Sequence, residues 1–159
     1  MEIYILRHGI AEEPRPGRAD AQRALTEDGK LKLRRILLRA DKAQVAPSLI
    51  LTSPYLRALE TAEIAAQVLG YHGQVVRTPA LATGSSPPAL WAELRSRPDE
   101  TAVLLSGHEP LLSATAAYLL NAPTLKIDLK KGALIRIDAD PKTAAPRGVL
   151  KWLLTAKLA

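Results

Sequence analysis

The sequence contains no cysteine and no phenylalanine, and aromatic residues make up only 4% of its 159 residues. The absence of cysteine excludes disulfides, thiolate metal sites and a cysteine nucleophile. No apolar run approaches the length of a membrane span. Glu2, Arg7 and His8 near the start are unlike the basic and apolar segments of a signal peptide. We therefore expect a cytoplasmic protein that makes no membrane contact.

The composition is otherwise that of a globular protein, with 47% hydrophobic and 24% charged residues, and residues 1–159 suit a single domain. Part of the net charge of +6 lies in one expected helix, residues 27–40. This basic helix either attracts an anionic partner or is a solvated helix face. The second interpretation is favoured, because the basic residues are not interleaved with aromatics and no nucleic-acid-binding motif is present. We expect no nucleic-acid partner.

Strands and helices alternate along most of the chain. The expected strands cover residues 2–6, 48–51, 74–78, 101–105, 133–137 and 149–154, and the expected helices cover residues 27–40, 54–69, 89–96 and 110–120. This order predicts an α/β protein with a mostly parallel sheet, in which the last two strands are antiparallel. The loops at 10–25 and 79–88 are long enough to act as lids or specificity loops.

Several residues mark where the first two helices begin and end. Thr26 is the expected N-cap of the first helix. Ser53 is expected to cap the second helix, with Pro54 in its first position, and Gly70 is expected to end it. The expected apolar residues of the first helix are Leu31, Ile36, Leu37 and Leu38.

Polar residues follow three of the expected strands. These residues form the stretches Arg7–Gly9, Ser53–Arg57 and Gly107–Pro110. If the strands are parallel neighbours, all three stretches meet at the carboxyl edge of the sheet, which is the usual ligand crevice of an α/β protein. Two arginines and two histidines would then lie beside two helix N-termini. Paired guanidinium N–H groups and helix N-termini both suit a phosphate.

The two histidines are expected to differ in charge. Arg7 beside His8 disfavours a charged imidazole, and a neutral ring nitrogen is a nucleophile. Gly9 lets the backbone turn closely at this point. His108 has no adjacent arginine, and in its protonated form it could hold the charge of a transferring phosphoryl group. Each motif taken singly could equally be structural.

Three stretches together resemble the histidine phosphatase superfamily, which includes the phosphoglycerate mutases. They are RHG at residues 7–9, SPYLRALETA at 53–62 and SGHEP at 106–110. The stretch DAQRALT at 20–26, followed by Gly29, is similar to the D-x-x-R-x-L-T-x-x-G stretch of the small SixA-type phosphohistidine phosphatases. Ile10 stands where that group often has Asp.

The resemblance implies a three-layer α/β/α sandwich around a mixed sheet, with no cap domain. It also implies a phosphatase without metal or cofactor that works through a phosphohistidine on the enzyme. By position, His8 would be the nucleophile, and Arg7, Arg57 and His108 would complete the phosphate pocket. The expected substrate-binding set is Arg7, Gly9, Arg57, His108 and Glu109. Thr61 either holds the arginine or packs in the core.

Two points stay open on the sequence alone. A general acid could be Glu109, Glu12, Glu13 or Asp20, or there could be none, because a leaving imidazole can arrive protonated. The substrate is expected to be a phosphohistidine protein, such as a histidine phosphotransfer domain in signal transduction. The alternatives are a phosphomonoesterase acting on a sugar phosphate or nucleotide, and a non-catalytic phosphate-binding module.

Overall fold

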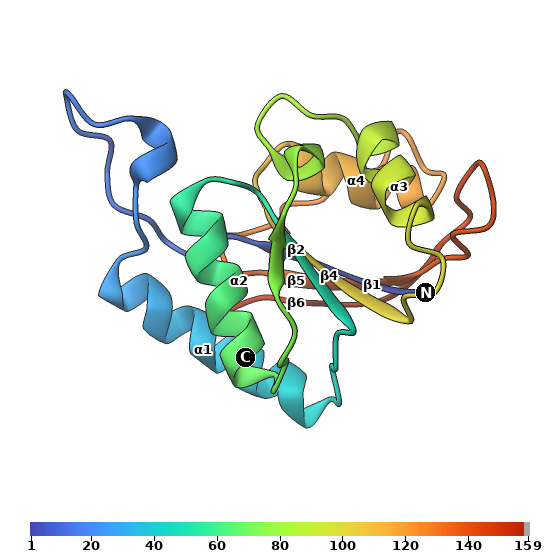
Figure 1. Ribbon diagram of the computed structural model, residues 1–159, viewed down its shortest axis with the longest axis horizontal. Coiled ribbons are helices and arrows are strands. Elements are labelled where there is room, and N and C mark those ends of the chain that lie inside the picture. The colour runs from blue at the N-terminus through green and yellow to red at the C-terminus, as the bar shows by residue number, and fades with distance from the viewer. Residues whose placement is uncertain (158–159) are drawn as a thin grey trace.

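The structure is a computed structural model that describes residues 1–157, and it is a three-layer α/β/α sandwich (Figure 1). The central sheet has six strands in the order β3-β2-β4-β1-β5-β6. The strands are β1 (Glu2–Arg7), β2 (Leu49–Thr52), β3 (Val75–Arg77), β4 (Ala102–Gly107), β5 (Leu134–Asp138) and β6 (Val149–Leu154). Strands β1 to β4 run parallel to one another, whereas β5 is antiparallel to both of its neighbours, β1 and β6. The predicted mixed, mostly parallel sheet is confirmed.

Helices cover both faces of the sheet. They are α1 (Glu27–Lys42), α2 (Leu56–Val68), α3 (Pro87–Arg95) and α4 (Leu111–Leu119), with short 3-10 turns η1 (Asp20–Gln22) and η2 (Pro79–Leu81). Helices α1 and α2 lie on one face, and α3 and α4 lie on the other (Figure 1). Among the described residues, no cap is inserted into this sandwich, and no helix is long and apolar enough to cross a bilayer.

The strands are apolar along their length because both faces of the sheet are covered. Alternate residues of β1 show this directly. Ile3 and Ile5 pack in the core on the α3–α4 side, while Tyr4 and Leu6 pack on the α1–α2 side. All four side chains are fully buried. The two cores hold the parallel strands rigidly, so that the residues at their carboxyl ends have fixed positions.

Helix α1 begins as predicted but buries a different face. Thr26 Oγ1 accepts a hydrogen bond from the backbone N–H of Gly29, which makes it the expected N-cap. Leu31 and Leu38, however, are 60% and 53% exposed. They lie seven residues apart, on the helix face opposite Leu33, because the helix repeats every 3.6 residues. Of the four apolar residues named for this helix, only Ile36 and Leu37 are therefore buried in the core.

Helix α2 starts later than predicted. Its first residue is Leu56, its N-cap is Tyr55, and Ser53 is not its cap. The hydroxyl of Ser53 is instead hydrogen bonded to His108, on the neighbouring strand end. Gly70 ends the helix as predicted, with a φ of +63° that favours glycine.

Candidate active site

The parallel strand ends bring the predicted site residues together. Strands β1 and β2 are both hydrogen-bonded to β4 in parallel register, so their carboxyl ends lie at one edge of the sheet. His8 follows β1, His108 follows β4, and Arg57 lies in the first turn of α2, which follows β2. The His8 and His108 rings are 5.1 Å apart between centroids. His8, His108 and Arg57 are respectively 7%, 4% and 5% exposed.

The tautomer of His8 is set by its own backbone turn. Nδ1 lies 2.7 Å from the carbonyl oxygen of Gly9. A carbonyl oxygen can only accept, so Nδ1 carries the proton and Nε2 keeps its lone pair. Burial, aided by His108, Arg57 and Arg7, lowers the pKa of His8 to about 3, although the hydrogen bond to the carbonyl oxygen of Gly9 acts in the opposite direction. The ring is therefore neutral at pH 7, and burial is a larger cause of this than the expected effect of Arg7.

The RHG turn is tied to α2 by one buried hydroxyl. Thr61 Oγ1 accepts a hydrogen bond from the backbone N–H of Gly9 and donates one to the carbonyl oxygen of Arg57. It therefore links the turn that follows β1 to the first turn of α2. The side chain is also fully buried, so Thr61 packs in the core, and its bond reaches the backbone of Arg57 rather than the guanidinium.

The ring of His108 is held by Ser53 and Tyr55. Its Nε2 lies 2.8 Å from Ser53 Oγ, which itself accepts a hydrogen bond from the backbone N–H of Tyr55. Among the described residues, Ser53 Oγ has no other acceptor for its own proton, so that proton points to Nε2 and the imidazole proton is on Nδ1. Burial and Arg57 lower the pKa of His108 to about 4. The ring is thus neutral at pH 7, and the protonated form considered from the sequence requires a negative charge beside the ring.

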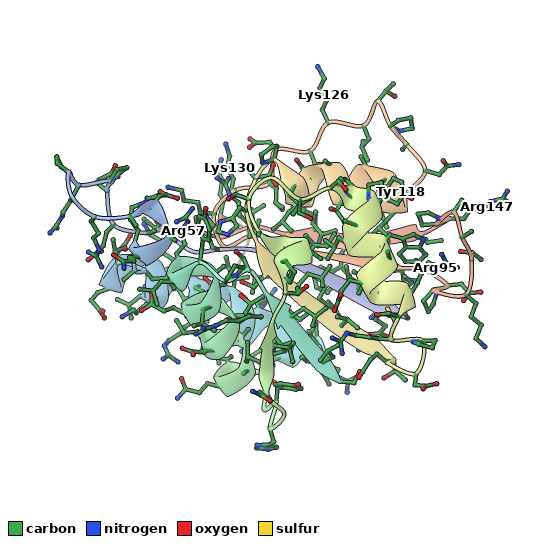
Figure 2. The ribbon with its side chains drawn as sticks, turned by 45° about the horizontal axis from the view of Figure 1, so that its top comes forward. Arg57, Arg95, Tyr118, Lys126, Lys130 and Arg147 are labelled. Atoms are coloured by element: carbon green, nitrogen blue, oxygen red, sulfur yellow. The ribbon has the colours of Figure 1, made fainter. Side chains whose placement is uncertain are left out.

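The two arginines of the cluster have different partners. Arg7 Nη1 donates to the carbonyl oxygen of Leu129, in the loop between α4 and β5. The Arg57 guanidinium lies over the ring of Tyr55, 5.0 Å from its centroid. Figure 2 shows Arg57 at the start of α2, and it shows Lys126 and Lys130 extending outward from the α4–β5 loop. This loop adds positive charge near the strand ends.

Within residues 1–157, only four buried side-chain atoms have no hydrogen-bond partner, and three of them belong to this cluster. They are Nε of Arg7, Nε of Arg57 and Nδ1 of His108. All three are N–H donors in the protonation states described above. A buried donor without an acceptor costs free energy. The cluster is therefore suited to bind a group with several acceptor oxygens, such as a phosphate.

The four carboxylates considered as general acids have different positions. Glu109 Oε1 accepts a hydrogen bond from the backbone N–H of Ser113, so this carboxylate caps the start of α4. Glu12 pairs with Arg18 at 2.7 Å, and Glu13 is exposed. Asp20 contacts Arg57, and its pKa is lowered by hydrogen bonds from Arg23 and Arg57. The carboxylates of Glu109 and Asp20 therefore already have partners other than a leaving group.

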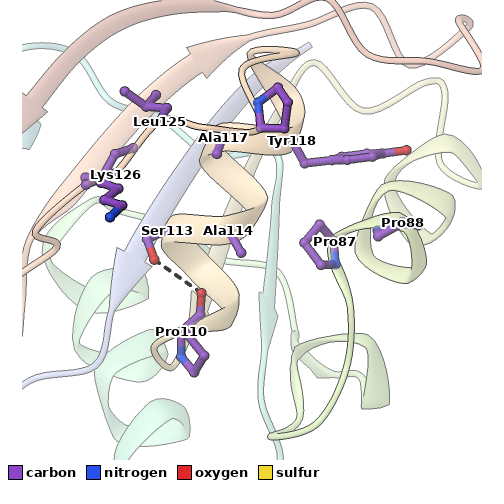
Figure 3. A pocket seen from close by; sticks show the side chains of 11 residues that line it. Pro87, Pro88, Pro110, Ser113, Ala114, Ala117, Tyr118, Leu125 and Lys126 are labelled. Carbon is purple, nitrogen blue, oxygen red and sulfur yellow. Dashed lines mark hydrogen bonds between the residues drawn. The ribbon is translucent and has the colours of Figure 1, made fainter.

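Two adjacent cavities lie beside α4, and His108 lines the smaller one. The smaller, about 210 Å³, is lined by His108, Glu109 and residues 83–85 among others. The larger, about 520 Å³, is an apolar groove along α4 that includes Tyr118, Leu125 and Ile127 (Figure 3). The two share Pro87, Pro110 and Ala114 as lining residues. An apolar surface therefore extends from the site outward along α4.

Comparison with known proteins agrees with this architecture. A model of the histidine phosphatase superfamily (branch 1) matches residues 3–82. The chain belongs to this superfamily. An uncharacterized protein from a Picosynechococcus species is 34% identical over 137 residues, covering 85% of this chain and 83% of that protein.

Two solved structures share the fold. The structure of the protein histidine phosphatase SixA complexed with tungstate has a TM-score of 0.86 and 24% identity, covering 99% of this chain and 98% of that chain. A mycobacterial glucosyl-3-phosphoglycerate phosphatase has a TM-score of 0.67 and 18% identity, covering 94% of this chain and 96% of that chain. One fold therefore serves a protein phosphatase and a small-molecule phosphatase.

Sequence reasoning missed three contributors to the site. Ser53 was interpreted as a helix cap, and the contacts of Tyr55 and of Asp20 were not foreseen. Tyr55 could have been noticed as one of only four tyrosines in a chain with few aromatics. Asp20 is the first residue of the D-x-x-R stretch, and this motif was the signal that its side chain has a specific partner.

Proposed function

We propose that this chain is a phosphatase that hydrolyses protein phosphohistidine through a covalent phosphohistidine on His8. The observation that carries the proposal is the set of buried N–H donors without partners around a neutral histidine. Two guanidinium Nε–H groups and one imidazole Nδ1–H match the oxygens of a phosphoryl group. The lone pair on His8 Nε2 is the matching nucleophile.

The reaction has two steps in this proposal. His8 Nε2 attacks phosphorus, the phosphorus–nitrogen bond to the substrate imidazole breaks, and that imidazole leaves with the proton on its other ring nitrogen. Water then attacks phosphorus, the bond to His8 breaks, and phosphate is released with the protons of the water shared between phosphate and solvent. In both steps Arg7, Arg57 and His108 balance the charge on the phosphoryl oxygens.

The positions of the carboxylates support an imidazole as leaving group. An alkoxide needs a proton from a general acid, whereas a protonated imidazole does not. The Glu109 carboxylate lies against the backbone N–H of Ser113, and the pKa of Asp20 is lowered, so that Asp20 is ionised at pH 7. The apolar groove along α4 is a second support, because it suits a protein surface better than a polar sugar or nucleotide.

The test is to detect the covalent intermediate. Brief exposure to a phosphohistidine protein should leave an acid-labile phosphate on the wild-type chain and none on His8→Ala. His72→Ala is the matched control, since His72 is exposed and lies in the turn after α2. This control should be labelled like the wild type. The same phosphate release in wild type and His8→Ala would show that the nucleophile is wrong.

A small-ester phosphatase is the competing function, and the fold shared with glucosyl-3-phosphoglycerate phosphatase supports it. A rate panel on phosphohistidine protein, sugar phosphates and nucleotides separates the two. We expect the phosphohistidine protein to be preferred and its turnover to survive Glu109→Gln. Faster ester turnover that collapses in Glu109→Gln would identify Glu109 as a general acid and favour the ester.

A further inference from the structure

Asp20, in the loop before α1, contacts the arginine of the proposed phosphate pocket through two separate atoms. Arg57 Nη1 donates to the backbone carbonyl oxygen of Asp20 at 2.8 Å, and Arg57 Nη2 donates to its carboxylate Oδ2 at 3.0 Å. The Arg57 side chain is 6% exposed, whereas that of Asp20 is 54% exposed. The buried guanidinium is therefore held from its solvent side by the 3-10 turn η1.

The contact uses only one edge of the guanidinium. Both bonds involve the terminal nitrogens, and Arg57 Nε remains buried without a partner among the described residues. Tyr55 covers one face of the same group. A planar guanidinium held at its terminal nitrogens and on one face has a fixed orientation, so its Nε edge is the edge left for a ligand.

We propose that Asp20 is a positioning residue that orients the Nε edge of Arg57 toward the phosphoryl group. The inference rests on the proposed function, because it assumes that Arg57 binds the phosphoryl oxygens. Asp20 does not touch the substrate in this arrangement. It acts through Arg57, and its negative charge also limits the repulsion between Arg57 and the other cations of the site.

Asp20 is itself held in place by Arg23. Arg23 Nε donates to Asp20 Oδ1 at 2.8 Å, and Arg23 Nη1 donates to the carbonyl oxygen of Glu12 at 2.7 Å. A continuous series of hydrogen bonds therefore runs from the backbone of Glu12 through Arg23 and Asp20 to Arg57. Because these bonds lower the pKa of Asp20, the carboxyl is ionised and cannot supply a proton to a leaving group. This removes the general-acid role for Asp20.

The rival role for Asp20 is shielding, and it predicts the opposite sign. A carboxylate beside Arg57 reduces the positive potential that attracts an anion. If shielding were its main effect, removing the carboxylate would strengthen anion binding. If positioning is its main effect, removing it weakens anion binding even though the site becomes more positive, because Arg57 is then held only by the backbone carbonyl of Asp20 and is oriented less firmly.

The experiment measures tungstate binding by calorimetry at fixed ionic strength, together with kcat and KM for a phosphohistidine protein. The variants are Asp20→Ala and Asp20→Asn. The control is Glu13→Ala, which makes the same charge change in the same loop at an exposed residue. We expect Asp20→Ala to weaken tungstate binding roughly tenfold, the loss typical of one hydrogen bond to a charged group. Asp20→Asn keeps an acceptor oxygen and should recover part of that loss. Glu13→Ala should bind tungstate like the wild type.

The outcomes separate this inference from the proposed function. Unchanged or tighter tungstate binding in Asp20→Ala, with unchanged kcat/KM, would show that Asp20 shields or only covers Arg57. A wild-type chain that binds no tungstate and forms no phosphohistidine would instead contradict the proposed function. If Asp20→Ala does not fold by circular dichroism, Arg23→Lys replaces it, because it keeps the positive charge but removes the Nε–H that holds Asp20, without touching Arg57. A smaller loss in the same direction is then expected, and no loss overturns the inference.

Discussion

The substitution Ser53→Ala tests whether the tautomer of His108 is held by the protein. Ser53 is fully buried, its Oγ lies 2.8 Å from His108 Nε2, and it accepts a longer bond of 3.3 Å from the Tyr55 backbone. The alanine variant loses both contacts and adds no bulk. It also leaves Nε2 of a buried ring without a donor. Because the bond to the Tyr55 backbone is the longer of the two, we expect the effect on activity to pass mainly through the position or tautomer of His108.

The size of the effect follows from the bonds removed. A typical hydrogen bond contributes about 0.5–1.5 kcal/mol net, and a buried group left without its partner costs about 1–3 kcal/mol. We expect Ser53→Ala to lower the free energy of unfolding by about 1–2 kcal/mol. We also expect the preference for the Nδ1–H tautomer to weaken by about 1 kcal/mol. That change corresponds to a roughly fivefold lower kcat/KM.

The assay compares kcat/KM for a phosphohistidine protein in the wild type, Ser53→Ala and Ser106→Ala. Ser106 is a matched control, because it is also fully buried and donates one hydrogen bond of 2.8 Å, but to the carbonyl oxygen of Ala58. Both variants should lose stability, and only Ser53→Ala should lose activity. Nitrogen NMR of the imidazole should show the changed tautomer in Ser53→Ala. Equal activity in all three proteins, with an unchanged tautomer, would refute the reasoning.

Two further predictions concern stability. The folded-state pKa values of His8 and His108 are lowered to about 3 and about 4 from an ordinary 6.5, so the unfolded chain binds protons first as the pH falls. The free energy of unfolding should be level above about pH 7 and fall below pH 6.5 by up to about 1.4 kcal/mol per pH unit for each histidine. Urea titrations should find this slope reduced in a His8→Ala, His108→Ala double variant, and an equal slope would contradict the prediction. Gly29→Ala should destabilise the protein by about 1–3 kcal/mol despite the better helix propensity of alanine, because its Cβ would overlap the carbonyl group of Ile10. A more stable variant in chemical denaturation would show that this contact relaxes.

The sheet and the central cluster could be predicted because strand ends follow a simple rule. Parallel strands that are neighbours present their carboxyl ends at one edge, so Arg7, His8 and His108 meet there wherever the loops go. Burial on both faces also made the strands readable as continuous apolar runs. The sequence therefore predicted where the site lies, and the family resemblance supplied the expected roles.

The contacts around that cluster could not be predicted in the same way. Asp20 and Arg57 are 37 residues apart, and their contact depends on the path of the loop between β1 and α1. Ser53 looked like a helix cap because serine before proline is a common helix start. Its hydroxyl instead serves His108, 55 residues away. Local patterns describe a residue's neighbours along the chain, whereas these partners are set by tertiary packing.

The structure also changes how charge is divided between the histidines. At pH 7 both rings are neutral, since burial and the nearby arginines lower both pKa values. A bound phosphoryl group reverses part of this effect at His108, because negative charge beside Nδ1 favours the imidazolium form. In the proposed mechanism His8 differs, since its Nε2 must keep a lone pair to attack phosphorus. Substrate binding would then be the event that separates a neutral nucleophile from a cationic phosphate ligand.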